Sequence, residues 1–197
     1  MKLYELHESV NTPIIVVDVQ PEYASFAKKI VNRGLFDYLN EQRGPILAFF
    51  NGEETTNDSK QEVVDYWIEN GFDPDELDKI EWHNKTYGYF RDWMAGPDHG
   101  VDISDSLIIK VIREMYQKRI SDSQDFDDEE LLSLVGEEIF DYCKNYSIWL
   151  PSIAVTKLRD YTNSYICGGA RHECLREITL LMNAFNIKYK MIDKFVY

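Results

Sequence analysis

The stretch "PIIVVDVQ", residues 13–20, is the feature that most limits the folds open to this chain. It places Ile14, Ile15, Val16 and Val17 in succession, whereas a strand with one solvated face would alternate apolar and polar residues. A short continuous apolar run of this kind is typical of a strand buried on both faces of a parallel sheet. The charged residue Asp18 follows the run directly. The stretch therefore predicts a central parallel strand with a polar group at its carboxyl end.

Strand and helix patterns alternate before and after a long helical stretch. The order predicts an α/β fold, a three-layer Rossmann-like parallel sheet with a helical insertion at about residues 104–161. Turn residues such as Gly44-Pro45 separate the elements. The predicted strands are 13–20, 46–51, 79–84, 164–169 and 188–197, and the predicted helices are 25–41, 57–71, 104–120, 128–146, 151–161 and 172–185.

Length, charge and cysteine content restrict the class of protein. A chain of 197 residues fits a single domain, which we expect to span 1–197. Its 21 Lys and Arg against 35 Asp and Glu give a net charge of -14, which repels nucleic acid and anionic lipid. The chain has neither a signal-like N-terminus nor an apolar run of about 18 residues, so we expect no membrane contact and a cytoplasmic location. Three sparse cysteines, Cys143, Cys167 and Cys174, suit a reducing compartment.

Polar residues follow the predicted strands at the positions where a parallel sheet binds ligands. Asp18 and Gln20 follow the first strand, Lys85 follows the third, and Cys174 begins the helix after the fourth. A thiol at a helix N-terminus and near an ammonium group ionises more readily, so we expect Cys174 to be an accessible, reactive thiol. Asp18 would exchange protons, and N–H groups between Gly168 and Cys174 would form an oxyanion hole.

Each of these residues also has an ordinary structural interpretation. A lone cysteine is usually a buried packing residue, and an aspartate after a strand can cap a helix or stay solvated in a loop. A lysine after a strand is usually solvated. The acidic run "DFDDEE", residues 125–130, is interpreted as a solvated loop that leads into the first turn of a helix.

Three segments together resemble the isochorismatase-like cysteine hydrolases, a family that includes nicotinamidases. They are "VVDVQPEY", "NKTYGYF" and "ICGGARHECLREITLLMNAFNIKYKMID". The first is similar to the family's aspartate, glutamine and aromatic pattern, supplied here by Asp18, Gln20 and Tyr23. The last places Gly169-Ala170 where the family has a non-proline cis peptide bond, which the resemblance therefore implies here. Lys85 precedes Phe90 as the family's lysine precedes a phenylalanine, and the alternative, Lys110, lies in a helical pattern typical of a surface lysine.

The resemblance implies a cysteine hydrolase that acts on the C–N bond of a small-molecule amide without a cofactor. Asp18 would be the general base, Lys85 would stabilise the thiolate, and Cys174 would attack the carbonyl carbon. The N–H groups of Ala170 and Cys174 would hold the oxyanion. Four further residues would contact the substrate: Gln20, Tyr23, Phe90 and Arg91.

The chain departs from the family in its metal ligands and in its helical insertion. Nicotinamidases bind a metal through an aspartate and two histidines after the second strand, whereas "NGEETTND" here has no histidine, so we expect no metal. His83 and His99 are more typical of packing or surface positions. The aromatic residues of the helical stretch would form a lid over the site, an interface in a homo-oligomer, or plain core; they are Trp93, Tyr116, Phe140, Tyr142, Tyr146 and Trp149.

Two other functions fit parts of the sequence. An idle member of the same family could use its acidic surface to bind a protein or to imitate nucleic acid, which would require carboxylates clustered on one face. A flavodoxin-like nucleotide binder is a weaker alternative, because "ICGGARHE" is not a G-x-G-x-x-G fingerprint and the sequence has no P-loop.

Overall fold

A five-stranded, all-parallel sheet forms the centre of the fold, and its strands stand in the order β3-β2-β1-β4-β5. The computed structural model describes residues 12–52, 58–85, 90–122, 126–144 and 158–197. The strands are β1 (Ile14–Val17), β2 (Ile46–Phe50), β3 (Ile80–Asn84), β4 (Asn163–Gly168) and β5 (Lys188–Val196). With helices flanking the sheet, the chain has the predicted α/β, Rossmann-like three-layer fold.

The first strand lies in the middle of the sheet, as its continuous apolar run predicted. All four residues of β1 are buried, and Val17 pairs with Phe49 of β2 on one side and with Gly168 of β4 on the other. The chain moves outward from β1 through β2 to β3, and then resumes at β4 on the other side of β1. The boundary between β1 and β4 is therefore the point where strand order reverses, and ligands of such sheets bind beyond the carboxyl ends of the strands there.

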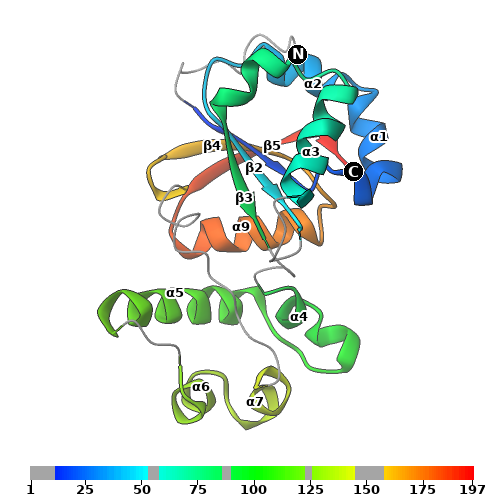
Figure 1. Cartoon of the computed structure of the whole chain (residues 1–197). Helices are drawn as coiled ribbons and strands as arrows, with labels where there is room; N and C mark the ends of the chain where they lie inside the picture. The colour runs from blue at the N-terminus through cyan, green and yellow to red at the C-terminus, as the bar shows by residue number, and fades with distance from the viewer. Residues whose placement is uncertain (1–11, 53–57, 86–89, 123–125, 145–157) are drawn as a thin grey trace. The chain divides into compact units, whose positions relative to one another are not determined.

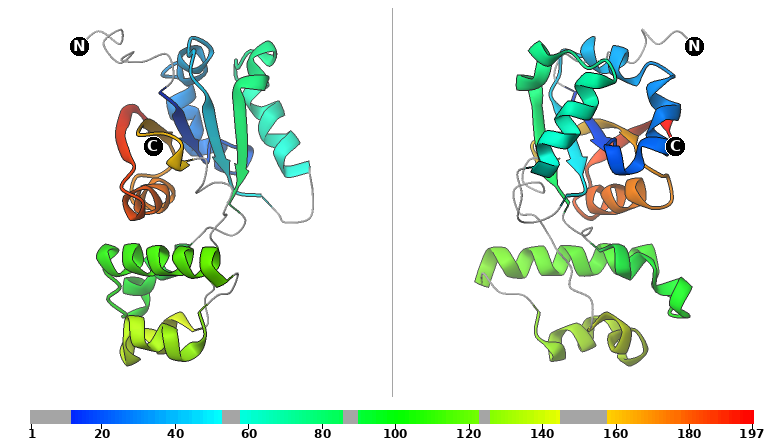
Figure 2. Two further views of the ribbon diagram at one scale, coloured as in Figure 1. Left: turned by 90° about the vertical axis from the view of Figure 1, so that its left-hand side faces the viewer. Right: turned by 45° about the vertical axis from the view of Figure 1, so that its right-hand side comes forward.

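Three helices cover one face of the sheet (Figure 1 and Figure 2): α1 (Ala24–Val31), α2 (Leu35–Asn40) and α3 (Asp58–Glu69). The sheet contributes alternate residues to this core, among them Ile14 and Val16, as expected for a strand whose side chains alternate between faces. The predicted helix 25–41 is divided in two, because Gly34 adopts a left-handed conformation with φ 83° that starts a second helix.

Helices also make up the described part of the chain between β3 and β4, where no strand occurs. They are α4 (Arg91–Met94), the 3-10 helix η4 (Gly96–His99), α5 (Asp105–Asp122), α6 (Asp128–Val135) and α7 (Glu137–Cys143). The predicted helix 128–146 is broken at Gly136, where φ is 83°. The acidic run supplies the first turn of α6, as predicted, and Asp127 in addition caps the helix through reciprocal hydrogen bonds with Glu130. Most of the predicted helix 151–161 lies outside the described residues.

The chain forms two compact units. The first comprises Met1–Tyr87, Asp160–Arg176 and Lys188–Tyr197, and it contains the whole sheet. The second comprises Gly88–Arg159 and Glu177–Ile187, and it contains most of α9 (Cys174–Ala184). Trp93 and Tyr116 are buried in the second unit, which fits a core role, whereas Tyr146 and Trp149 lie outside the described residues. None of the described helices has the length and apolar character needed to cross a membrane.

Candidate active site

Asp18 and Lys85 form an ion pair at the carboxyl end of the sheet. The distance from Lys85 Nζ to Asp18 Oδ2 is 2.5 Å, and both side chains are 0% exposed. Asp18 follows β1 and Lys85 follows β3, so the two residues come from strands that β2 separates. A buried ion pair is stable only where geometry and further hydrogen bonds offset the cost of removing two charges from water.

Successive carbonyl groups of β2 hold the backbones of both partners. The Asp18 N–H donates to the carbonyl oxygen of Phe49 at 2.8 Å, and the Lys85 N–H donates to that of Phe50, also at 2.8 Å. Each residue thus continues its strand by one hydrogen bond beyond the last sheet pair. The middle strand consequently sets the separation at which the two side chains meet.

Asp18 has an unusual backbone conformation and one unpaired carboxylate oxygen. Its φ of 52° lies in the left-handed region, which residues other than glycine rarely adopt. Oδ2 contacts Lys85, whereas Oδ1 is buried and has no hydrogen-bond partner among the described residues. The Asp18 carbonyl oxygen accepts a hydrogen bond from the hydroxyl of Tyr197 at 2.8 Å. Oδ1 is therefore the carboxylate oxygen that is not engaged by Lys85.

The loop after Asp18 is anchored by two side chains. Trp67 of α3 donates its indole N–H to the Val19 carbonyl oxygen at 2.7 Å. The Gln20 amide both donates to the carbonyl oxygen of Asn51 and accepts from its N–H, each at 2.8 Å. These bonds tie the ends of β1 and β2 together, so the Gln20 side chain, a predicted substrate contact, is occupied in holding two loops.

Cys174 is the first residue of α9 and follows β4 through a tight turn. Gly168 adopts φ 92° and approaches β1 so closely that a Cβ built on it would lie 2.2 Å from the Val17 carbonyl oxygen. The next residue, Gly169, donates its N–H to the same oxygen at 2.7 Å, and a Cβ on it would lie 2.9 Å from the Cβ of Cys174. Only glycines fit both positions, and they bring the start of α9 against the end of β1.

The setting of Cys174 differs from expectation in two respects. The residue is 6% exposed, whereas we expected an accessible thiol, and the tight turn before α9 brings Gly169 against its Cβ. The expected cis peptide bond between Gly169 and Ala170 is also wrong, since the described residues contain none. A trans bond avoids a cost of about 3–4 kcal/mol, and the positive φ of Gly168 reverses the chain without it.

Tyr197 lies close to both Asp18 and Cys174 and was not predicted from the sequence. Burial raises the pKa of its phenol, and the negative charges of Asp18 and Cys174 raise this pKa further. The ring stacks on Phe26 with 5.9 Å between centroids and 19° between planes. The sequence does not distinguish this residue from the rest of the last strand, which runs directly up to it and ends at residue 196.

The other predicted substrate-binding residues are distributed over both units. Tyr23 is half-buried at the end of η2 (Pro21–Tyr23) in the first unit. Phe90 and Arg91 belong to the second unit, where Phe90 is buried and donates its N–H to Glu177 Oε1 at 3.1 Å. Arg91 is half-buried at the start of α4. Their contact with a substrate stays a prediction.

The histidines and Lys110 have ordinary surroundings. His83 is buried and stacks on Phe49 at 4.9 Å between centroids, and His99 is exposed beside Tyr142. Within the described ranges, no group of three or more His, Cys, Asp or Glu side chains could hold a metal ion. Lys110 is an exposed residue of α5, as its helical surroundings predicted.

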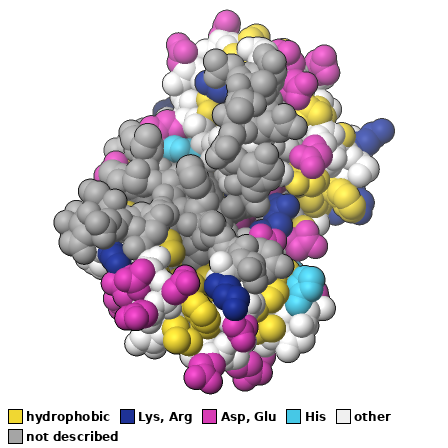
Figure 3. Space-filling view, turned by 60° about the horizontal axis from the view of Figure 1, so that its bottom comes forward, with side chains coloured by type: hydrophobic (Ala, Val, Ile, Leu, Met, Phe, Trp, Pro, Cys, Tyr) yellow, Lys and Arg dark blue, Asp and Glu magenta, His cyan; other side chains and the backbone are white. Residues whose placement is uncertain are grey.

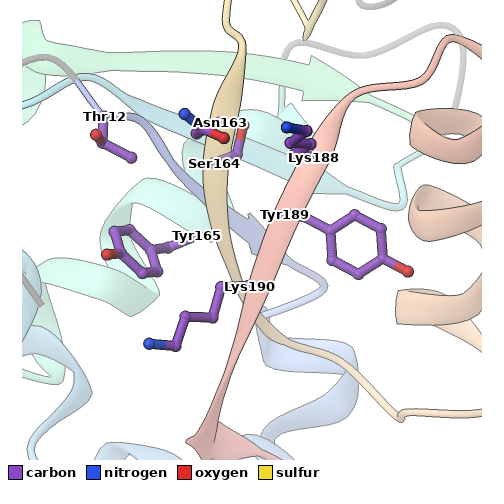
Figure 4. A pocket seen from close by; sticks show the side chains of 7 residues that line it. All are labelled: Thr12, Asn163, Ser164, Tyr165, Lys188, Tyr189 and Lys190. Atoms are coloured by element: carbon purple, nitrogen blue, oxygen red, sulfur yellow. The ribbon is translucent and has the colours of Figure 1, made fainter. Parts of the chain in front are cut away.

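A cavity of about 370 Å³ lies at the amino ends of the strands, near the beginnings of β4 and β5. Figure 4 shows Tyr165 and Lys190 on one side of these strands and Tyr189 on the other. Its lining is Thr12, Asn163, Ser164, Tyr165, Lys188, Tyr189 and Lys190. The ion pair stands at the carboxyl ends of the strands, so this cavity is no part of the candidate active site.

Comparison of the chain with family models, with curated proteins and with solved structures found no match.

We predict that Gly168→Ala destabilises the protein far more than Gly71→Ala. Both glycines have positive φ, 92° and 104°, but a Cβ at position 71 meets no atom within 4 Å, whereas at position 168 it meets β1. Gly71→Ala should cost about 1–2 kcal/mol from conformation alone, and Gly168→Ala at least about 3 kcal/mol in urea unfolding. Equal costs would contradict the close approach of β4 to β1.

We also predict that Lys85→Met lowers the free energy of unfolding by about 3–5 kcal/mol, because it leaves the Asp18 carboxylate buried without its cation. The double variant Asp18→Leu/Lys85→Met removes both charges and should be more stable than Lys85→Met alone. Urea unfolding of the two variants measures the difference. A loss under about 1 kcal/mol for Lys85→Met would show that the pair is not buried as described.

Proposed function

We propose that the protein is a cysteine hydrolase of small-molecule amides, with Asp18, Lys85 and Cys174 as its reactive groups. The observation that carries the proposal is the fully buried Asp18–Lys85 pair, which lies beside the point where strand order reverses. Cys174 begins α9 directly after β4, the strand next to β1. An acid, a cation and a thiol from three strand ends match the needs of nucleophilic catalysis.

Each residue has a role that its surroundings support. Lys85 offers a buried positive charge, which together with the N-terminus of the 11-residue helix α9 favours a thiolate at Cys174. Asp18 uses one carboxylate oxygen to orient Lys85, and the unpaired Oδ1 accepts a proton. Burial of the pair strengthens these electrostatic effects because water screens them little.

The reaction then proceeds through a thioester. Asp18 takes the proton of the Cys174 thiol, and the thiolate attacks the amide carbonyl carbon to form a C–S bond. When the C–N bond breaks, Asp18 returns the proton to the leaving nitrogen, so that an amine or ammonia departs. A water molecule gives a proton to Asp18 and attacks the thioester carbon. The C–S bond then breaks, Asp18 returns the proton to the Cys174 sulfur, and the carboxylic acid is released. The sum is amide plus water to acid plus amine.

The turn before α9 supplies the groups proposed for the oxyanion hole. The Ala170 carbonyl oxygen accepts hydrogen bonds from the N–H groups of Glu173 and Leu175, at 3.2 and 3.1 Å, which sets the turn that leads into the helix. The N–H groups of Ala170 and Cys174 flank this turn. Preorganised N–H groups of this kind stabilise the tetrahedral intermediate in acyl transfer.

The proposal extends to family, substrate class and location. Three of the residues that carry the resemblance to the isochorismatase-like hydrolases, Asp18, Lys85 and Cys174, follow strands of this sheet, and the presence of the cysteine favours C–N cleavage. The substrate would be a small amide, and no nucleic acid would bind a chain with a net charge of -14. The cytoplasm would keep the three cysteines reduced, and all three are buried without a disulfide.

An acidic binding module is the alternative function, and it would need carboxylates gathered on one face. On the face in Figure 3, the described Asp and Glu side chains lie in several separate places among basic, apolar and other groups. The acidic module stays the alternative, and the labelling tests below distinguish it from a hydrolase.

We predict that iodoacetamide labels Cys174 with a half-maximal rate below about pH 7.5, followed by intact-mass spectrometry. Burial raises the pKa of both Cys143 and Cys167 to about 12, so these thiols stay protonated and contribute little labelling. Cys174→Ala should abolish labelling. Because Cys174 is buried, the pH dependence of the rate, and not its absolute value, is the measure.

The lysine assignment is tested in the same assay. Lys85→Ala removes the cation that favours the thiolate and should shift the profile toward that of an ordinary thiol, at about pH 8.5. Lys110→Ala, which removes an exposed lysine of α5, should leave the profile unchanged. If the alkylation rate of wild-type Cys174 reaches half its maximum only at about pH 8.5, Cys174 is an ordinary thiol and the hydrolase proposal is wrong.

A further inference from the structure

The left-handed backbone of Asp18 needs support from neighbouring groups. A residue other than glycine in a sparsely populated conformation costs about 1–3 kcal/mol and persists only where the surrounding structure enforces it. Asp18 has φ 52° and is fully buried. Its side chain meets Lys85 only while the backbone keeps this conformation, because the direction of Cβ follows from the backbone.

Two hydrogen bonds hold the Asp18 backbone, one on each side of its Cα atom. The N–H bond to Phe49 belongs to the sheet and extends the β1–β2 ladder. The carbonyl bond comes from a side chain, the hydroxyl of Tyr197, at 2.8 Å. The first bond fixes the peptide before Asp18, and the second fixes the peptide after it. Tyr197 therefore fixes the orientation of the peptide group after Asp18, which the hydrogen bonds of the sheet do not hold.

The donor itself is held in place. Tyr197 is half-buried, packs against the core beneath α1 and stacks on Phe26. Its phenol stays protonated at neutral pH, because burial and the charges of Asp18 and Cys174 raise its pKa. A protonated phenol donates to the carbonyl oxygen and adds no negative charge beside the carboxylate.

We propose that Tyr197 is a positioning residue for the Asp18, Lys85 and Cys174 site: its hydroxyl holds Asp18 in the left-handed conformation that aims the carboxylate at Lys85. The catalytic part of this inference rests on the proposed hydrolase function, whereas the geometric part concerns the ion pair alone. Tyr197 touches no reacting atom in this account and acts only through Asp18.

The test compares Tyr197→Phe with Tyr189→Phe. The first variant keeps the ring and its stacking on Phe26 and removes only the hydroxyl. The second removes the hydroxyl of a half-buried tyrosine of β5 that lies at the opposite end of the sheet and forms no hydrogen bond through its side chain among the described residues. Two readouts are recorded for each protein: the ¹⁵N-detected NMR signal of the Lys85 ammonium, assigned with Lys85→Met, and the pH profile of Cys174 alkylation.

In Tyr197→Phe, we expect the Lys85 signal to shift or to broaden through faster proton exchange, and the alkylation rate at pH 7 to fall about tenfold. In Tyr189→Phe, both readouts should stay within about twofold of the wild type. If Tyr197→Phe lowers only the stability and leaves the Lys85 signal and the pH profile unchanged, the hydroxyl is merely structural and the inference is wrong.

The two proposals fail in distinguishable ways. If wild-type Cys174 shows no alkylation below pH 7.5 but Tyr197→Phe still moves the Lys85 signal, the hydrolase function falls and the positioning of Asp18 by Tyr197 stands. If wild-type Cys174 is reactive and Tyr197→Phe moves neither readout, the hydrolase function stands and the role of Tyr197 is overturned.

Discussion

The buried contact between Asp18 and Lys85 is the interaction on which the rest of this site depends. Neither charge is exposed to water, so each is tolerable only because the other lies 2.5 Å away. Such a pair is poor evidence of a gain in stability, since two apolar residues of similar size often serve a fold equally well. The pair instead suits the role proposed for it, which is to favour a thiolate at Cys174.

The pair also explains why several otherwise unremarkable residues stand where they do. Carbonyl groups at the end of β2 fix both backbones, and Trp67 and Gln20 anchor the loop that follows Asp18. Gly168 and Gly169 let β4 approach β1 without side chains between them, which brings Cys174 to the same sheet end. The parallel sheet thus acts as a frame that converts separate positions in the sequence into one cluster.

Much of this arrangement can be predicted from the sequence, because it follows from local patterns. The apolar run before Asp18 predicts a central strand, and the polar residues after each strand predict where chemistry can gather. Helix breaks are harder to predict, since Gly34 and Gly136 could equally sit inside a helix, and only their positive φ interrupts the pattern. The burial of Cys174 depends on how closely two strands approach, which no local pattern reports.

Tyr197 shows the limit of such reasoning most clearly. Its hydrogen bond to Asp18 joins residues 179 positions apart. In the sequence, Tyr197 looks like any tyrosine at the end of a strand. The peptide bond after Gly169 shows a different limit: the family resemblance implied cis, whereas the positive φ of Gly168 already makes the turn. Local sequence specifies which groups are present, and the packing of the sheet decides how they are held.

The ionisation state of Cys174 tests the central claim most directly. Ultraviolet absorbance of the thiolate near about 240 nm, recorded as a difference between wild type and Cys174→Ala, follows ionisation without requiring a reagent to reach a buried sulfur. The account predicts that the thiolate signal persists below pH 7 and is lost in Lys85→Ala, which removes the cation. A signal that appears only near pH 8.5 or above would mean that the Asp18–Lys85 pair does not activate this cysteine.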